Sequence, residues 1–167
     1  VKVPRFHPLT PAQYEHDIIE VTTYRTETGY SDHRRPDQVN FVTTLAEDLA
    51  RRDFTVNSLA ASIDRLTPPG GDRQTALSSL SIIDPFDGLA DIEKKIIRAV
   101  GDPERRFEED ALRIMRAIRF ISELRTPEKQ AEPLNWHIDE PTLEAVKKYA
   151  ASLNIISLER IRDEFSR

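Results

Sequence analysis

The sequence predicts an α+β fold in which a strand-containing part is followed by an all-helical part. β-branched residues are concentrated over residues 18–24, a composition that is typical of strands. A Pro-Pro-Gly-Gly breaker stands at residues 68–71, and beyond residue 84 the apolar residues recur mainly at helical spacing. We therefore divide the 167 residues into a strand-containing part, 1–83, and a helical part, 84–167.

The first part alternates apolar segments with turn-forming residues. Glycine, proline and aspartate mark its loops, because these residues suit turn geometry. The elements expected there, in order, are an irregular lead-in over 1–13, a strand over 18–24, a mobile loop over 26–37, a short strand over 39–42, a helical pattern over 45–62 interrupted at 51–53, and a short strand at 82–83.

The second part contains the longest helical pattern of the chain, residues 106–120. Pro103 precedes it at a position that proline favours near a helix N-terminus. A helix start over 88–95 comes before it, and helices over 142–153 and 157–166 follow. Ser157 is suited to cap the last of these helices.

One acidic and three basic residues follow one another at steps of three within 106–120. They are Asp110, Arg113, Arg116 and Arg119. On a continuous helix they form a short stripe, and the opposite side is apolar: Phe107, Ala111, Ile114, Met115, Ile118 and Ile121. A carboxylate beside fixed guanidinium groups suits a nucleotide, because it can accept from a base amine while arginines donate to ring acceptors and phosphate. The alternative is a solvated face with weak ion pairs.

The composition limits the kinds of partner. A net charge of −5 argues against a general electrostatic clamp on nucleic acid, so phosphate contacts must come from local arginine clusters or from other parts of the protein. Without cysteine there is no disulfide and no thiolate metal site, and the four histidines show no metal-ligand spacing. There is no long apolar run and no signal-like start, so we expect a cytoplasmic protein without a membrane partner.

Five sequence blocks occur in a fixed order between residues 17 and 124. The blocks are DIIEVTTYR at 17–25, ETGYSDHRRPDQVNFV at 27–42, LARRDFTVNSLA at 49–60, IIDPFDG at 82–88 and IIRAVGDPERRFEEDALRIMRAIRF at 96–120. In this order they resemble class II tRNA nucleotidyltransferases, the CCA-adding enzymes, and the related bacterial poly(A) polymerases. The resemblance implies part of a polymerase beta-like nucleotidyltransferase head over 1–83 and a helical neck over 84–167 that binds RNA and nucleotide.

The resemblance also implies a nucleotide site. Glu109, Asp110 and Arg113 match the family's EDxxR motif, which serves as a protein template for the incoming base. The other residues implied to bind nucleotide are Arg52, Asp53 and Asn57, which match the ribose-recognition block, and Arg116 and Arg119, which carry phosphate or orient Asp110. For Asp53 a helix N-cap is the alternative, and for Asn57 a plain surface amide.

The base-selection chemistry follows from the two side chains. Asp110 can accept from N4 of cytosine or N6 of adenine, and Arg113 can donate to the adjacent ring acceptor. Guanine and uracil present a carbonyl where those bases present an amine, and each lost buried bond costs roughly 1–3 kcal/mol. The pair therefore favours C and A without a nucleic acid template.

Two further regions are implied to assist. In the family's flexible loop the candidates are Asp32 and Arg34, and in its hinge Asp84, Asp87 and Gly88. Asp84 and Gly88 also fit ordinary turn chemistry, and Asp87 replaces the family's second hinge glycine. Glu20 could support the metal site, or it could be a charge at a strand edge.

The sequence departs from the family pattern in its catalytic elements. The family's GGxxRD loop and its DxD pair are absent, so we expect Mg²⁺ to be bound mainly by residues upstream of this chain. We read the chain as the later part of a longer protein or as half of a split one, inactive alone, with apparent insertions near 63–81 and 125–141.

The expected function is addition of CCA, or of its terminal A, to tRNA 3′ ends from CTP and ATP. The alternatives are a bacterial poly(A) polymerase and a non-catalytic module that binds nucleotide or RNA.

Overall fold

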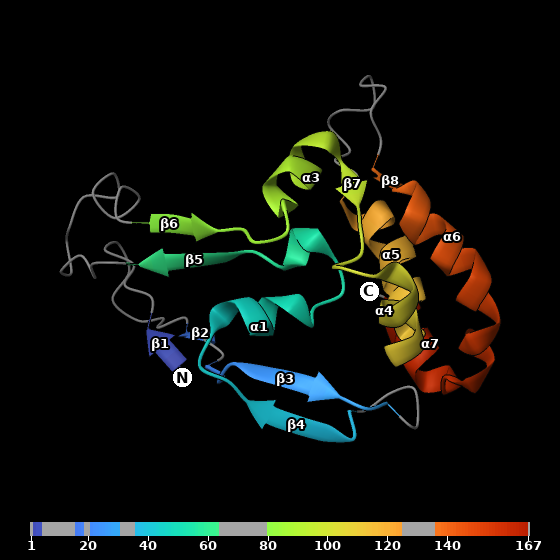
Figure 1. Cartoon of the computed structure of the whole chain (residues 1–167), viewed down its shortest axis with the longest axis horizontal. Coiled ribbons are helices and arrows are strands. Elements are labelled where there is room, and N and C mark those ends of the chain that lie inside the picture. The colour runs from blue at the N-terminus through green and yellow to red at the C-terminus, as the bar shows by residue number, and fades with distance from the viewer. Residues whose placement is uncertain are drawn as a thin grey trace.

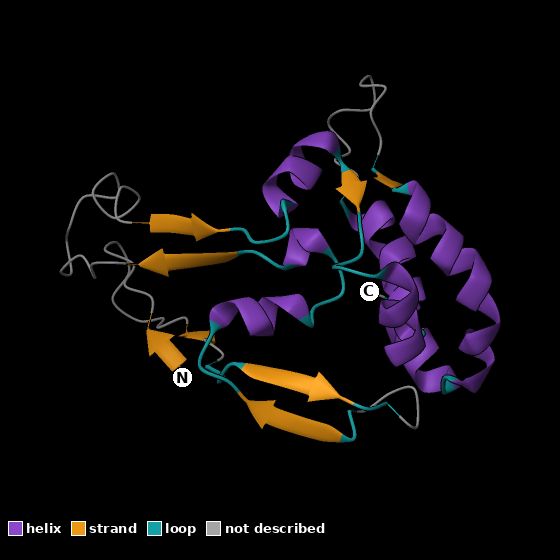
Figure 2. Cartoon of the chain, in the orientation of Figure 1, coloured by secondary structure: helices purple, strands orange, loops and turns teal. Residues whose placement is uncertain are grey.

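The computed structural model separates a strand-containing part from a helical part (Figure 1). It describes residues 2–4, 16–18, 21–30, 36–63, 80–124 and 136–166. Strands are confined mainly to the first part, whereas the helices from residue 103 onward gather on the other side of the molecule (Figure 2). This arrangement confirms the α+β class.

The strands pair two by two. Among the described residues there are four two-stranded sheets. The antiparallel pairs are β1 (Lys2–Pro4) with β2 (His16–Ile18), β3 (Arg25–Thr28) with β4 (Gln38–Phe41), and β5 (Ala60–Ile63) with β6 (Leu80–Ile83); the parallel pair is β7 (Ile96–Ile97) with β8 (His137–Ile138).

The helices are short. They are α1 (Leu45–Ala50), α3 (Gly88–Lys94), α4 (Pro103–Glu109), α5 (Leu112–Glu123), α6 (Glu140–Tyr149) and α7 (Leu158–Phe165), with 3₁₀ turns at Thr55–Asn57 and Ala150–Ile155. Ser157 stands at the N-cap of α7, but its side chain makes no capping hydrogen bond. In the described ranges no helix has the length and apolar character needed to cross a membrane.

The main core joins the two parts of the chain. Phe54 comes from the first part, and it packs against residues of the helical part: Ile97, Phe107, Ile114, Ala117 and Ala145. The same segment is bonded through its backbone, since Thr55 N–H donates to Arg98 O (2.9 Å) and Val100 N–H donates to Asp53 O (3.0 Å). The residues around Asp53 are therefore fixed to the helical part.

Several element predictions in the first part were wrong. Residues 21–24 form no strand, and the strand begins at Arg25. Arg25 pairs with Phe41, so both ends of the segment predicted as a loop belong to a two-stranded hairpin. Helix does not continue over 54–62, because residues 60–63 form β5 against β6. The pairing partner decides the conformation of these segments and outweighs their local propensity.

The predicted helix over 106–120 is interrupted at Asp110. This residue has extended backbone angles (φ −150°, ψ 106°), and its Oδ1 accepts from Leu112 N–H (3.0 Å) at the start of α5. Asp110 thus ends α4 and satisfies a free N–H of α5, as capping side chains do. Ile118, placed by the pattern on the apolar side of the helix, is 52% exposed.

The predicted hinge residues form a tight turn before α3. The carboxylate of Asp84 accepts from the backbone N–H groups of Gly88 (2.7 Å) and Leu89 (2.9 Å). Asp87 adopts a left-handed conformation (φ 59°), which suits glycine better than aspartate. A Cβ at Gly88 would lie 2.3 Å from the carbonyl oxygen of Thr55, so α3 can approach this segment only because residue 88 is glycine.

We expect Gly88→Ala to destabilise the protein by about 3 kcal/mol, because the added methyl group meets rigid backbone. Gly101→Ala is the matched control, since its added Cβ meets nothing within 4 Å and only the left-handed backbone (φ 69°) resists it, at about 1 kcal/mol. Urea unfolding of both variants checks the order. Equal losses of unfolding free energy in the two variants would contradict the close contact between residue 88 and the Thr55 carbonyl.

Candidate functional site

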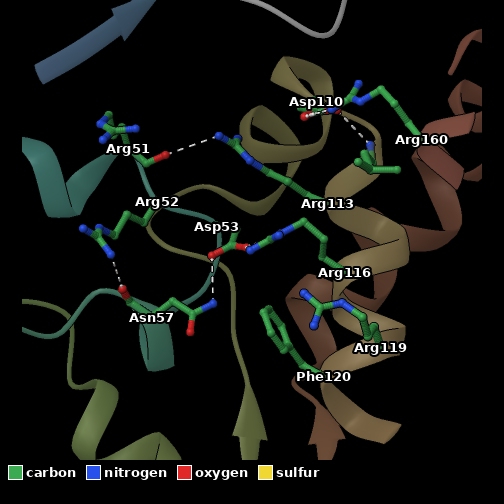
Figure 3. Close-up of a pocket in the computed structure, with 11 residues that line it drawn as sticks. Arg51, Arg52, Asp53, Asn57, Asp110, Arg113, Arg116, Arg119, Phe120 and Arg160 are labelled. Atoms are coloured by element: carbon green, nitrogen blue, oxygen red, sulfur yellow. Dashed lines mark hydrogen bonds and ion pairs between the residues drawn. The ribbon is translucent and has the colours of Figure 1, made fainter. Parts of the chain in front are cut away.

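An arginine-rich pocket of about 670 Å³ lies between the two parts of the chain (Figure 3). Residues from both parts line it: Arg51, Arg52, Asp53, Asn57, Asp110, Leu112, Arg113, Arg116, Arg119, Phe120 and Arg160. Six arginines thus face two aspartates. The surplus of positive charge in a partly enclosed space favours an anionic ligand.

The pocket brings together seven of the eight residues predicted to bind nucleotide. Glu109 is the exception, because it lies behind Arg113 and does not line the pocket. The sequence reasoning missed four lining residues: Arg51, Leu112, Phe120 and Arg160. The first three are adjacent in sequence to predicted residues, whereas Arg160 reaches the pocket only because α7 packs against α5.

Asp53 is buried and fully engaged. Its Oδ1 accepts from Phe54 N–H (2.9 Å) and Asn57 Nδ2 (3.2 Å), and its Oδ2 lies 2.6 Å from both Nε and Nη2 of Arg116. Asp53 therefore holds an arginine across the pocket (Figure 3) rather than acting only as a helix cap. Asn57 is likewise not a plain surface amide.

Asp110 is held by the C-terminal helix. Arg160 Nη2 on α7 donates to its Oδ2 at 2.9 Å, while Oδ1 accepts from Leu112 N–H. A carboxylate offers about four acceptor sites, so these two bonds leave capacity for a further donor. The carboxyl group is half-buried at the pocket wall, where a ligand amine can reach it.

Arg113 is largely buried and is fixed from behind. Its Nη1 donates to Glu109 Oε2 (2.7 Å) and to Arg106 O (2.8 Å), and its Nη2 donates to Arg51 O (3.3 Å). A guanidinium group has five N–H donors. Among the described residues nothing else accepts from Arg113, so Nε–H and one Nη2–H remain available to a ligand.

Arg116 and Arg119 share the ring of Phe120. Their Cζ atoms lie 5.3 and 4.5 Å from its centroid. Arg119 Nε and Nη1 also donate to Glu164 and Glu123, at 2.5 Å each, and these carboxylates raise the pKa of Arg119. Both guanidinium groups are therefore restricted in orientation.

A second charge network connects the β3–β4 hairpin to the pocket. Arg51 contacts Glu27 Oε1 (3.0 Å) and Asp48 Oδ1 (2.7 Å). Burial alone would raise the pKa of Asp48, but hydrogen bonds from Arg51 and from the backbone N–H of Arg25 lower it. Tyr30 donates to Glu27 Oε2 (2.9 Å), and burial together with this bond raises the pKa of Tyr30 to about 12.

Three predicted residues, Glu20, Asp32 and Arg34, lie outside the described residues. Within the described ranges no three histidine, cysteine or acidic side chains gather in a way that could hold a metal ion. The described residues therefore do not fit a magnesium site, and binding of the metal mainly by residues upstream of this chain stays a prediction.

Two family models match the chain. The model described as "Poly A polymerase head domain" matches residues 4–98, and the model described as "Probable RNA and SrmB- binding site of polymerase A" matches residues 135–167. The first match covers more than half of the chain. The protein thus belongs to the poly A polymerase head domain family, which confirms the resemblance to tRNA nucleotidyltransferases and poly(A) polymerases.

Curated relatives and solved structures support the same family assignment. CCA-adding enzymes of Lactobacillus johnsonii and Pediococcus pentosaceus are 46% and 50% identical over 95% and 89% of this chain, covering 34% and 31% of their own length. The Bacillus stearothermophilus CCA-adding enzyme in complex with CTP has a TM-score of 0.60 and 35% identity, with 98% of this chain and 31% of that chain covered. The chain thus spans about a third of the length of these relatives.

A Thermotoga maritima CCA-adding enzyme complexed with tRNA is also similar. It has a TM-score of 0.51 and 32% identity, with 72% of this chain and 24% of that chain covered.

We expect Glu109→Gln to destabilise the protein by about 3 kcal/mol, because it leaves two buried guanidinium groups, Arg106 and Arg113, without their shared counter-charge. The control Glu93→Gln lies on the exposed side of α3 and should change stability by less than about 0.5 kcal/mol. Urea unfolding measures both. If Glu109→Gln lowered the free energy of unfolding as little as Glu93→Gln, the ion pairs of Glu109 with Arg106 and Arg113 would contribute nothing to stability.

Tyr30 should give the fold a dependence on alkaline pH. Its pKa is raised from 10.0 to about 12, so its contribution to stability is complete below pH 10 and is lost as the pH rises through about 12. In phenolate absorbance, Tyr30→Phe should remove a titration step near pH 12 that Tyr149→Phe leaves in place. A step that survives in Tyr30→Phe belongs to another group.

Proposed function

We propose that the complete protein is a CCA-adding tRNA nucleotidyltransferase and that this chain carries its nucleotide-selecting pocket. In this proposal residues 1–83 belong to the head and 84–167 to the neck, with Asp84, Asp87 and Gly88 at the hinge. The substrates are CTP, ATP and the 3′ end of tRNA. The proposal is supported by family membership and by relatives and structures whose names describe CCA addition, CTP and tRNA.

The single observation that carries the proposal is the placement of Asp110 and Arg113 at one pocket wall. Asp110 and Arg113 do not bond to each other through their side chains. Asp110 bonds to Arg160 instead, and Arg113 bonds to Glu109. Asp110 therefore keeps a free acceptor site and Arg113 keeps free N–H groups, and we infer that both reach a base bound in the pocket. Cytosine and adenine match this order, with an amine beside a ring acceptor, while uracil and guanine present a carbonyl and a ring N–H.

The remaining lining residues fit the rest of a nucleoside triphosphate. We assign Arg116 and Arg119 to phosphate oxygens, because guanidinium groups bind phosphate strongly. Arg52 and Asn57 are assigned to the nucleotide at the ribose end, and Asp53 is assigned to orient Asn57 and Arg116 there. Glu109 acts from behind by orienting Arg113, which modifies the role expected from its motif.

Magnesium is proposed as the metal of the complete enzyme, held mainly by residues other than those described here. No step of nucleotide selection in this pocket requires it. When bound, it would supply charge stabilisation for transfer of the nucleotidyl group. The Asp110–Arg113 pair acts before that step, through hydrogen bonds to the base.

The first test is nucleotide incorporation by the full-length protein with Mg²⁺ and each nucleoside triphosphate. The acceptors are tRNAs that end before CCA, after C and after CC. We expect addition of C, C and then A, followed by a stop. Open-ended A addition would replace the proposal with a poly(A) polymerase, and nucleotide binding without incorporation would replace it with a binding module.

The second test is substitution of Asp110 in the same protein. We expect Asp110→Ala to lower kcat/KM for CTP and ATP roughly 5- to 150-fold, the equivalent of one lost buried hydrogen bond. Asp110→Asn should also raise the use of UTP relative to CTP, because an amide can donate to a carbonyl. The control Asp163→Asn removes an exposed carboxylate of α7. Unchanged base preference in both Asp110 variants would refute the assignment.

A further inference from the structure

Phe120 lines the pocket without any polar atom to offer a ligand, yet its ring contacts two pocket arginines. The Cζ atoms of Arg119 and Arg116 lie 4.5 and 5.3 Å from the ring centroid (Figure 3). Both distances fall within the range of cation–π attraction, in which the negative face of an aromatic ring attracts a cation. One ring therefore serves two guanidinium groups.

The ring is itself held in place. Phe120 meets Phe54 edge to face, with centroids 5.8 Å apart and an interplanar angle of 90°. Phe54 is fully buried and directly follows Asp53, the residue that pairs with Arg116. The ring thus links α5 to the segment that carries the other half of the pocket, and its orientation is fixed by the core.

Arg116 and Arg119 are like charges close together on one helix, and the ring of Phe120 partly offsets their repulsion. They stand three residues apart on α5, so their guanidinium groups repel each other. Asp53 pairs with Arg116, and Glu164 and Glu123 pair with Arg119. The ring of Phe120 lies within cation–π distance of both guanidinium groups and so adds attraction to each.

The bonds to these carboxylates leave donors free. Arg116 uses Nε and Nη2, and Arg119 uses Nε and Nη1. Among the described residues nothing accepts from Nη1 of Arg116 or from Nη2 of Arg119. Two N–H-bearing nitrogens, both on charged groups of fixed orientation, are therefore available at the pocket wall.

We propose that Phe120 is a positioning residue for the phosphate end of the nucleotide. Its ring orients Arg116 and Arg119 so that their free N–H groups receive the oxygens of a polyphosphate. The ring touches no reacting atom and reads no base. This inference rests on the proposed function and adds to it a residue whose effect is specific to the phosphate groups.

The test uses the full-length protein with Phe120→Leu, which keeps an apolar side chain and removes the ring face. We expect KM for CTP and ATP to rise roughly 3- to 30-fold, the range of such cation–π contacts. The inhibition constant of inorganic triphosphate should rise in parallel. Affinity for cytidine, and the preference for C and A over U and G, should stay unchanged, because Asp110 and Arg113 set them.

Tyr149→Leu is the matched control. Tyr149 is also a half-buried aromatic residue packed against the main core, and it also contacts a cation, Lys148, at 5.5 Å. It lies on α6, outside the pocket lining. A general loss of packing would therefore affect both variants, whereas a loss of phosphate positioning affects only Phe120→Leu.

A fluorinated phenylalanine series at position 120 keeps the protein folded while it changes the ring face. Added fluorine withdraws electron density and weakens cation–π attraction with little change of shape. We expect the inhibition constant of inorganic triphosphate to rise stepwise with fluorine number, and Phe120→Tyr to behave like the parent protein. No trend along the series would overturn the proposal.

The outcomes separate this inference from the proposed function. If the parent protein adds C and A but Phe120→Leu matches Tyr149→Leu in triphosphate inhibition, the positioning role is wrong and the function stands. If the parent protein neither binds CTP nor responds to inorganic triphosphate, the proposed function has failed, and this inference fails with it.

Discussion

Backbone hydrogen bonds between residues 53–55 and 98–100 hold the two parts of the chain together, and the pocket depends on them. They fix an extended segment in which successive side chains point to opposite sides. Phe54 enters the core, and Asp53 beside it enters the pocket. The pocket therefore takes its geometry from the packed interior, where side chains have little freedom to move.

The charge distribution gives this rigid frame its chemical character. The chain as a whole is acidic, with a net charge of −5, yet six arginines and two aspartates line one pocket. Carboxylates at the back and sides, such as Glu109 and Glu164, hold individual guanidinium groups. A ligand then meets cations that are already oriented, so binding loses less side-chain entropy than it would with free arginines.

The sequence was most informative where function depends on local spacing. Two groups of residues singled out by short motifs line the same pocket: Arg52, Asp53 and Asn57, and Asp110, Arg113, Arg116 and Arg119. Glu109, the eighth predicted residue, does not line it. Spacing could not reveal Arg160, because its role depends on how α7 packs against α5. Nor could it place the strand at Arg25, which is decided by pairing with Phe41.

The interruption of the helix at Asp110 was also hidden from the periodic pattern, and the proposed base selection depends on it. On a continuous helix, Asp110 and Arg113 would be neighbours at i and i+3 and would pair with each other. Such a pair would satisfy its own donors and acceptors and would have little left for a base. The extended backbone at Asp110 instead turns its carboxylate toward Arg160, while Arg113 turns back to Glu109. The break thus prevents mutual neutralisation and leaves an acceptor on Asp110 and donors on Arg113 in the same pocket, as the proposed distinction of an amine from a carbonyl requires.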